Sequence, residues 1–163
     1  MGRKQIKCHG DESRFEEVAK FIYDRFGKNI EYIADVAGGQ GLLSRILNKK
    51  YNYKAEVIDP RGYVLGGVPS KQTEYSSEMA EYYDLIVGLH PDSATREIVL
   101  SAGNSLILLI PCCNEWDKTK KLGSRELIKA ITGHLDSMNI KNETVTFDFK
   151  GPKNIGIIGG IQQ

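Results

Sequence analysis

The stretch Tyr32-Ile33-Ala34-Asp35-Val36-Ala37-Gly38-Gly39-Gln40-Gly41 decides the fold that this sequence predicts. Its first half is a short apolar run that is typical of a buried strand. Its second half is a glycine-rich turn, and residues 42–47 behind it begin a helix. A glycine cluster between a strand and a helix lets the backbone approach a ligand and directs free helix N–H groups at it. We therefore expect a ligand site at the carboxyl end of this strand.

Two acidic residues are placed to take part in that site. Asp35 lies at the end of the strand, where it can accept hydrogen bonds from a ligand amine or from the loop amides. About twenty residues later, Asp59 ends a second apolar strand at 55–58, and a carboxylate there can accept both hydroxyls of a ribose. The pair predicts an adenosine-type ligand. The alternative is that the glycines serve only the turn between strand and helix.

The choice of nucleotide rests on the residues around the glycines. Gly39-x-Gly41-x-x-Ser44 nearly satisfies the dinucleotide fingerprint G-x-G-x-x-G/A, so a nicotinamide or flavin enzyme is an alternative. Against it, about thirty residues precede the strand, whereas such domains usually open on it. A chain of 163 residues also leaves little room for a substrate domain. A P-loop is excluded because no Gly-Lys-Ser/Thr follows the glycines.

The order of expected elements predicts an α/β fold. Apolar runs and helical periodicity alternate along the chain, which favours a parallel sheet with right-handed crossovers. The expected strands are 32–36, 55–58, 83–89 and 106–110, the expected helices begin near 12, 42, 93 and 124, and residues 143–149 and 155–158 form an antiparallel hairpin. Residues 61–75 are rich in glycine and proline, so we expect a long loop with at most a short strand near 72–74. The predicted architecture is a Rossmann-like three-layer αβα sandwich, with a mostly parallel sheet of seven or six strands and a C-terminal hairpin.

The composition limits the class of protein. It is 40% hydrophobic and 26% charged, which is close to the globular average. No apolar run approaches the roughly 20 residues of a membrane-spanning helix, and no signal peptide is apparent, so we expect a cytoplasmic protein without a membrane partner. The net charge of +1 means that a nucleic-acid partner would need a local basic patch. The sequence predicts no oligomeric state.

These residues resemble a known family. Residues 35–41 look like motif I of the class I S-adenosylmethionine-dependent methyltransferases, with Ala37 where the first glycine usually stands. Asp59 matches the family's ribose-binding acidic residue, and the terminal hairpin matches its final strand pair. The resemblance implies one methyltransferase-like domain over 1–163, with 1–29 as an N-terminal helical lead-in, and S-adenosyl-L-methionine as cofactor. The implied cofactor-binding residues are Asp35, Ala37, Gly38, Gly39, Gln40, Gly41, Asp59, Pro60, Arg61, Leu89 and His90.

A narrower resemblance concerns two later segments. Residues 88–96, which contain Leu89-His90, and residues 109–113, which end in Pro-Cys-Cys, are similar to paired signatures of a methyltransferase-like family. That family includes tRNA ribose 2′-O-methyltransferases, so RNA is one candidate acceptor. Pro91-Asp92 replaces the Cys-Gly that follows the histidine in the family. The resemblance implies that His90 and Cys112 lie beside the transferable methyl group and are the candidate catalytic residues.

Each candidate has a competing structural interpretation. His90 can act as a general base or orient the acceptor, or it can merely bond to loop backbone. Cys112 and Cys113 can be nucleophiles, but we favour small hydrophobic side chains packed under the cofactor. Asp92 can serve acid–base chemistry or cap a helix.

A metal site is not predicted. Cys8, His9, His90 and the cysteine pair at 112–113 could supply ligands, but no C-x-x-C spacing supports a site. An odd cysteine count, with two adjacent, also argues against a disulfide framework.

The segment after the cysteines contains the remaining candidates for acceptor binding. Trp116 can stack on an acceptor base, although we slightly prefer a partly buried loop anchor. Lys118, Lys120, Lys121 and Arg125 can form a basic patch or a solvated loop. The sequence therefore predicts a methyltransferase with an unidentified acceptor. The alternatives are a non-catalytic S-adenosylmethionine- or nucleotide-binding module and a small NAD-binding domain.

Overall fold

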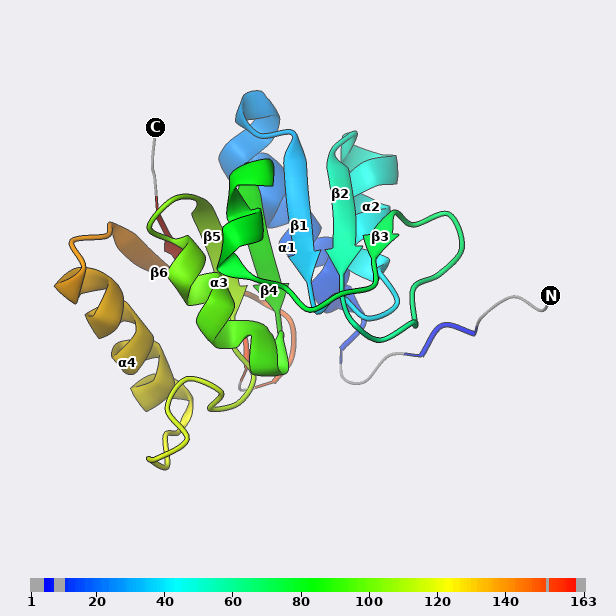
Figure 1. Ribbon diagram of the computed structural model, residues 1–163. Coiled ribbons are helices and arrows are strands. Elements are labelled where there is room, and N and C mark those ends of the chain that lie inside the picture. The colour runs from blue at the N-terminus through cyan, green and yellow to red at the C-terminus, as the bar shows by residue number, and fades with distance from the viewer. Residues whose placement is uncertain (1–4, 8–10, 152, 161–163) are drawn as a thin grey trace.

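The computed structural model describes residues 5–7, 11–151 and 153–160, and within these residues seven strands form one sheet (Figure 1). The strand order is β3-β2-β1-β4-β5-β7-β6. The strands are β1 Tyr32–Val36, β2 Lys54–Ile58, β3 Ser70–Lys71, β4 Leu85–Leu89, β5 Leu106–Ile110, β6 Asn142–Thr146 and β7 Ile155–Gly159. β3, β2, β1, β4 and β5 run parallel, whereas β7 is antiparallel to both β5 and β6. The predicted α/β fold with a C-terminal hairpin is confirmed.

Helices cover both faces of the sheet, which gives three layers (Figure 1). The helices α1 and α2 lie behind the sheet in Figure 1, and α3 and α4 lie in front of it. Their bounds are α1 Ser13–Phe26, α2 Leu42–Tyr51, α3 Thr95–Ser101 and α4 Ser124–Ser137, with short 3₁₀ turns at Gly27–Asn29, Ser77–Tyr82 and Asp92–Ala94. Each pair of helices packs its apolar face against the sheet and forms its own hydrophobic cluster.

The central strands are apolar on both faces because helices cover both. In β4, Leu85 and Val87 pack toward α1 and α2, while Ile86 packs toward α3 and α4. β5 follows the same alternation, with Leu108 on one face and Leu109 on the other. Each such Leu or Ile contributes about 1.5–3 kcal/mol by its burial. This explains why β4 and β5 are continuous apolar runs in the sequence rather than alternating ones.

The topology creates a binding edge. The parallel strands bring their carboxyl ends to one side of the sheet, and the connections reverse direction between β1 and β4. Open α/β sheets bind ligands in the crevice outside such a reversal. The glycine loop after β1 and the His90 segment after β4 therefore face each other across this point.

Some element boundaries differ from the sequence expectation. The short strand lies at Ser70–Lys71 rather than at 72–74, because Val57 donates its amide to the Pro69 carbonyl and thereby fixes the register. The helix expected from 93 begins as an α-helix only at Thr95, after a 3₁₀ turn. The 3₁₀ turn at Ser77–Tyr82 was not expected. Pro152 of the predicted hairpin turn lies outside the described residues. No helix in the described part of the chain is both long and apolar enough to cross a membrane.

Candidate active site

A cleft of about 700 Å³ opens at the carboxyl edge of the sheet. The loop at 37–40 forms one wall, and the segments after β2 and β4 form others. Among the residues predicted to bind the cofactor, the wall contains Asp35, Ala37, Gly38, Gly39, Gln40, Arg61, Leu89 and His90. Gly41, Asp59 and Pro60 are not part of it. The structure thus brings most of the predicted residues together around one cavity.

Asp35 supports the loop from below. It is 2% exposed, and its Oδ2 accepts hydrogen bonds from the Ser44 hydroxyl at 2.8 Å and the Ser44 amide at 3.3 Å. Burial raises the pKa of Asp35 to about 6, although the bonds from Ser44 oppose the rise. A Cβ on Gly38 would lie 2.6 Å from the Asp35 carboxyl carbon. Only glycine therefore fits above this carboxyl group.

The loop uses left-handed backbone at three positions. Ala37, Gly39 and Gly41 have φ values of 55°, 60° and 83°. A Cβ on Gly41 would also lie 2.8 Å from the Val68 side chain, so its glycine serves both the turn and the packing. Ala37 takes a conformation that glycine adopts more easily. The unusual alanine of the motif is therefore accommodated, and its amide donates to the Ile58 carbonyl at 2.8 Å.

Asp59 lies behind the cleft wall and is fully engaged. It is 1% exposed, and Arg61 binds it through Nε to Oδ1 at 3.0 Å and Nη2 to Oδ2 at 2.8 Å. The amides of Gly39 and Arg61 donate to it as well, at 2.9 Å and 2.8 Å. Burial alone would raise the pKa of Asp59, but these hydrogen bonds outweigh it and the pKa lies below its usual value. Ribose hydroxyls would have to share or replace these donors.

The Gln40 side chain holds the N-terminal segment across the loop. Its amide nitrogen donates to the Gln5 carbonyl at 2.8 Å, and its amide oxygen accepts from the Lys7 amide at 2.7 Å. Gln5 and Lys7 thereby become part of the cleft wall. Gln40, a variable position of the glycine motif, is thus bonded to the N-terminal segment, and the sequence did not indicate this contact.

His90 lies on the cleft wall at the end of β4. Its Nε2 lies 2.9 Å from the Lys153 carbonyl. A carbonyl only accepts, so Nε2 carries the proton and the neutral ring keeps its lone pair on Nδ1. Burial, reinforced by the nearby Arg14 charge, lowers the pKa of His90. The ring is therefore neutral at pH 7, and both interpretations hold in part: His90 bonds to loop backbone and also faces the cleft.

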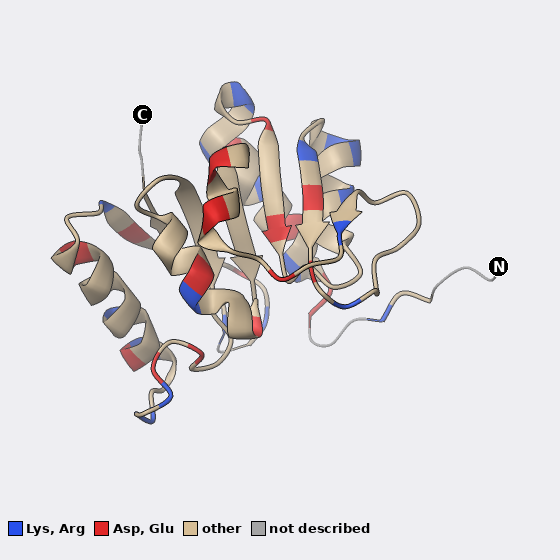
Figure 2. Ribbon diagram, in the orientation of Figure 1, with Lys and Arg blue, Asp and Glu red and all other residues tan. Residues whose placement is uncertain are grey.

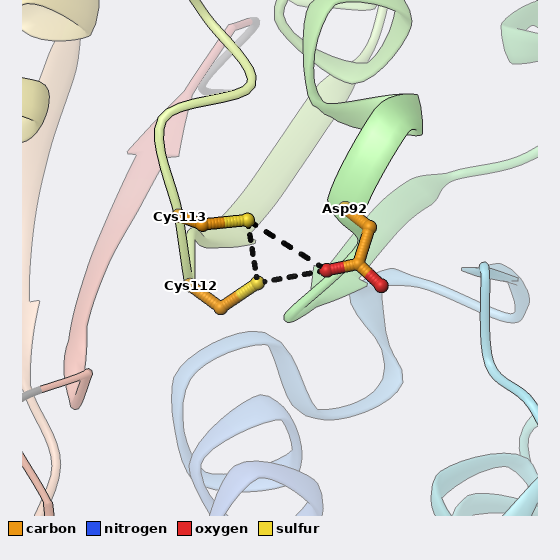
Figure 3. A group of neighbouring side chains, drawn as sticks. All are labelled: Asp92, Cys112 and Cys113. Carbon is orange, nitrogen blue, oxygen red and sulfur yellow. Dashed lines mark hydrogen bonds between the residues drawn. The ribbon is translucent and has the colours of Figure 1, made fainter. Parts of the chain in front are cut away.

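Cys112 and Cys113 lie outside the wall of the cleft of about 700 Å³. They line a neighbouring cleft of about 280 Å³, and neither belongs to the wall of the larger one. Cys112 donates a hydrogen bond to Asp92 Oδ1 at 3.0 Å (Figure 3), and the interpretation of small hydrophobic side chains packed under the cofactor stays a prediction. Burial and the neighbouring Asp92 raise the pKa of the Cys112 thiol to about 12. The Asp92 side chain bonds to the thiols and caps no helix.

The loop after β5 is anchored by its tryptophan. The Arg96 guanidinium lies 4.7 Å from the Trp116 ring centre, and His134 meets that ring edge-on at 5.0 Å. The anchor interpretation of Trp116 is thereby supported. Figure 2 shows basic residues at the tip of this loop. Lys118 and Lys120 form exposed ion pairs with Glu115 and Asp117, at 3.0 Å and 3.9 Å, which reduce the local positive charge.

Several residues of the cleft carried no recognised signal in the sequence. Arg14 and Phe15 of α1 line it, and so does Tyr63. Phe15 is half-buried between core and cleft. The first turn of α1 reaches the cleft because α1 packs beside α2, which periodicity along one helix cannot reveal.

No protein-family model and no curated protein matches the sequence. Solved structures do match. The sugar N-methyltransferase KedS8 from Streptoalloteichus is 13% identical, with 100% of this chain and 99% of that chain covered and a TM-score of 0.58. A SAM-dependent methyltransferase from Archaeoglobus fulgidus is 15% identical, with 91% and 96% covered and a TM-score of 0.55. The plantazolicin methyltransferase BpumL, solved with S-adenosylhomocysteine, is 12% identical, with 93% and 86% covered and a TM-score of 0.59. The chain therefore has the fold of the S-adenosylmethionine-dependent methyltransferases.

Proposed function

We propose that the chain is an S-adenosylmethionine-dependent methyltransferase that binds its cofactor in the cleft of about 700 Å³. One observation carries the proposal: the glycine loop rests on buried Asp35 and is tied to buried Asp59 by the Gly39 amide. This arrangement lets a ligand approach the backbone closely and offers a carboxylate to its ribose. Both lie where the strand connections reverse direction, between β1 and β4. Such a site suits an adenosine ligand, and the shared fold supports the methyltransferase among adenosine-binding proteins.

The cleft residues suggest how the cofactor would be oriented. Asp59 would accept the ribose hydroxyls at the β2 side, in competition with Arg61. Tyr63, which is 56% exposed and lies on the same wall, offers a ring for the adenine to stack on. Arg14, which also lines the cleft, offers a positive charge for the cofactor carboxylate. The methyl-bearing sulfonium would then lie near Leu89 and His90.

We assign the catalytic role to His90 rather than to Cys112. Methyl transfer from a sulfonium depends mainly on alignment of the nucleophile, the methyl group and the sulfur. A neutral imidazole with a free lone pair on Nδ1 can take the proton that the acceptor loses. The Cys112 thiol stays protonated at pH 7 because its pKa is about 12, and the thiolate is the nucleophilic form.

We place the acceptor in the neighbouring cleft of about 280 Å³. Lys153 lines it, and the Lys153 carbonyl bonds to His90, so the base stands between the two clefts. RNA is the acceptor class that the narrower resemblance implies. Its support is the group Lys118, Lys120 and Lys121, which lines a depression next to this cleft.

A labelled-methyl assay tests turnover and acceptor together. The protein is incubated with S-adenosylmethionine carrying a labelled methyl group and with separate RNA, protein and small-molecule fractions. Transfer into one fraction, with loss in His90→Asn, is the expected result. Binding of S-adenosylhomocysteine without transfer into any fraction would contradict the enzyme and favour the non-catalytic binding module.

A further inference from the structure

Two thiols and a carboxylate converge at the carboxyl edge of the sheet, where the larger cleft, lined by Asp92, adjoins the smaller one, lined by the cysteines. Cys112 Sγ lies 3.0 Å from Asp92 Oδ1 and 3.5 Å from Cys113 Sγ. Cys113 Sγ lies 3.9 Å from the same Asp92 oxygen. Figure 3 shows both sulfurs turned toward Asp92, which comes from the segment after β4, whereas the cysteines follow β5.

The chain has to turn to produce this convergence. In an extended strand, neighbouring side chains point to opposite faces. Cys112 and Cys113 come after the end of β5, and the Glu115 amide bonds back to the Cys113 carbonyl at 2.8 Å, so the backbone bends here. Asp92 itself has a left-handed φ of 50°. Adjacent cysteines that would otherwise diverge therefore point to the same oxygen.

The spacing of the three atoms suits one tetrahedral ion. With zinc–sulfur bonds of about 2.3 Å and zinc–oxygen bonds of about 2.0 Å, tetrahedral ligands lie about 3.5–3.8 Å from one another. The observed separations of 3.0, 3.5 and 3.9 Å bracket that range. In the parts of the chain that the structure describes, this is the group in which three possible ligand atoms lie within 4.8 Å of one another.

The surrounding charges leave the group available to a cation. Arg61 is near enough to Asp92 to interact electrostatically, but its guanidinium is bound to Asp59 through two hydrogen bonds. Lys153 lines the neighbouring cleft, where its carbonyl is bonded to His90. The hydrogen-bonding partners of the cluster therefore come mainly from within it.

We propose that Asp92, Cys112 and Cys113 bind a thiophilic divalent cation, with zinc as the preferred ion. Thiolates select zinc over magnesium or calcium. Binding would release the two thiol protons to solvent, because cysteine ligates as thiolate. Asp92 lines the cofactor cleft and the cysteines line its neighbour, so the ion would lie between the two clefts. Three protein ligands leave a fourth position for water or an acceptor atom. The proposal does not depend on the methyltransferase assignment.

Cobalt titration of the reduced, metal-free full chain tests the site without any cofactor. Cobalt(II) replaces zinc and reports thiolate ligands by a charge-transfer band in the near ultraviolet. We expect one ion per chain, a Kd below about 1 µM, and displacement by zinc. Cys112→Ser and Cys113→Ser should lose the band, and Asp92→Asn should weaken binding at least about tenfold. Cys113 is exposed, so its variant is expected to stay folded, which circular dichroism checks.

Cys8→Ser provides the matched thiol control, since Cys8 lies outside the described residues and is not among the proposed ligands. It should keep the band and the affinity. A wild-type chain that binds neither cobalt nor zinc would overturn the proposal. An equal loss in Cys8→Ser, or a band that survives in folded Cys113→Ser, would overturn it as well.

Discussion

Arg61 holds Asp59 with both arms of its guanidinium group, Nε at 3.0 Å from Oδ1 and Nη2 at 2.8 Å from Oδ2. The side chain of Asp59 is fully buried, whereas that of Arg61 is 48% exposed, so the pair closes the carboxylate off from the cleft. The same two oxygens are the ones that a ribose would need. Arg61 therefore competes with the proposed ligand for the Asp59 carboxylate.

Replacing Arg61 with methionine should have opposite effects on stability and on binding. Loss of the partner leaves Asp59 buried with fewer donors, so we expect a destabilisation of about 1 kcal/mol. Ribose would no longer have to displace the guanidinium, so S-adenosylhomocysteine should bind about threefold more tightly. Thermal unfolding and calorimetry measure the two quantities. Weaker cofactor binding in Arg61→Met would show that the arginine assists the ligand instead.

A single methyl group at Gly38 should disrupt the loop. The added Cβ would lie within 2.7 Å of all three carboxyl atoms of Asp35, so either the loop or the carboxyl group must shift. We expect Gly38→Ala to cost about 1–3 kcal/mol of stability and to weaken S-adenosylhomocysteine binding at least about tenfold. Gly66→Ala is the control, because nothing lies within 4 Å of a Cβ there. Equal behaviour of the two variants would contradict the close approach.

Asp35 should make stability depend on pH in an identifiable window. Its pKa is raised from 3.8 to about 6 by burial, so the folded state holds a proton that the unfolded state has lost between these values. Folding stability should therefore fall as the pH rises from 4 to 7, by about 2 kcal/mol in total. Asp35→Asn removes the contribution of Asp35 to the pH dependence of stability. The difference in unfolding free energy between variant and wild type, measured in urea at pH 4 and pH 7, should change by that amount; parallel pH profiles would argue against it.

His90→Asn should separate chemistry from cofactor binding. Asparagine tolerates the left-handed backbone that His90 adopts at a φ of 53°, so the loop should keep its shape. Turnover should fall at least about 100-fold if His90 is the general base, while affinity for S-adenosylhomocysteine stays within about threefold. Because burial lowers the pKa of His90, the acid limb of wild-type kcat should lie below pH 6.5. Unchanged kcat in the variant would exclude the base role.

The fold could be predicted because short stretches of sequence identify its central strands and the turn that follows the first of them. β1, β4 and β5 are apolar runs, the glycines follow β1 directly, and polar and apolar residues alternate from 144 to 149, which overlaps β6. The short strand expected near 72–74 was wrongly placed. β3 pairs only with the last residues of β2, and tertiary contacts set that register.

The site was predictable where the motif is continuous and not where distant segments meet. Asp35 and His90 could be placed on the cleft wall because each lies at the carboxyl end of a parallel strand. The capture of Asp59 by Arg61 depends on a side-chain conformation that spacing does not encode. Asp92 and Cys112 are separated by 20 residues, and only the pairing of β4 with β5 brings them together.

Calorimetric titration with S-adenosylhomocysteine and, separately, with NAD tests the central claim most directly, in the wild-type chain and in Asp59→Ala. We predict that S-adenosylhomocysteine binds at least about tenfold more tightly than NAD, and that Asp59→Ala weakens it at least about tenfold, or roughly 1.4 kcal/mol. Tighter binding of NAD, or an affinity for S-adenosylhomocysteine that is unchanged in Asp59→Ala, would contradict the account.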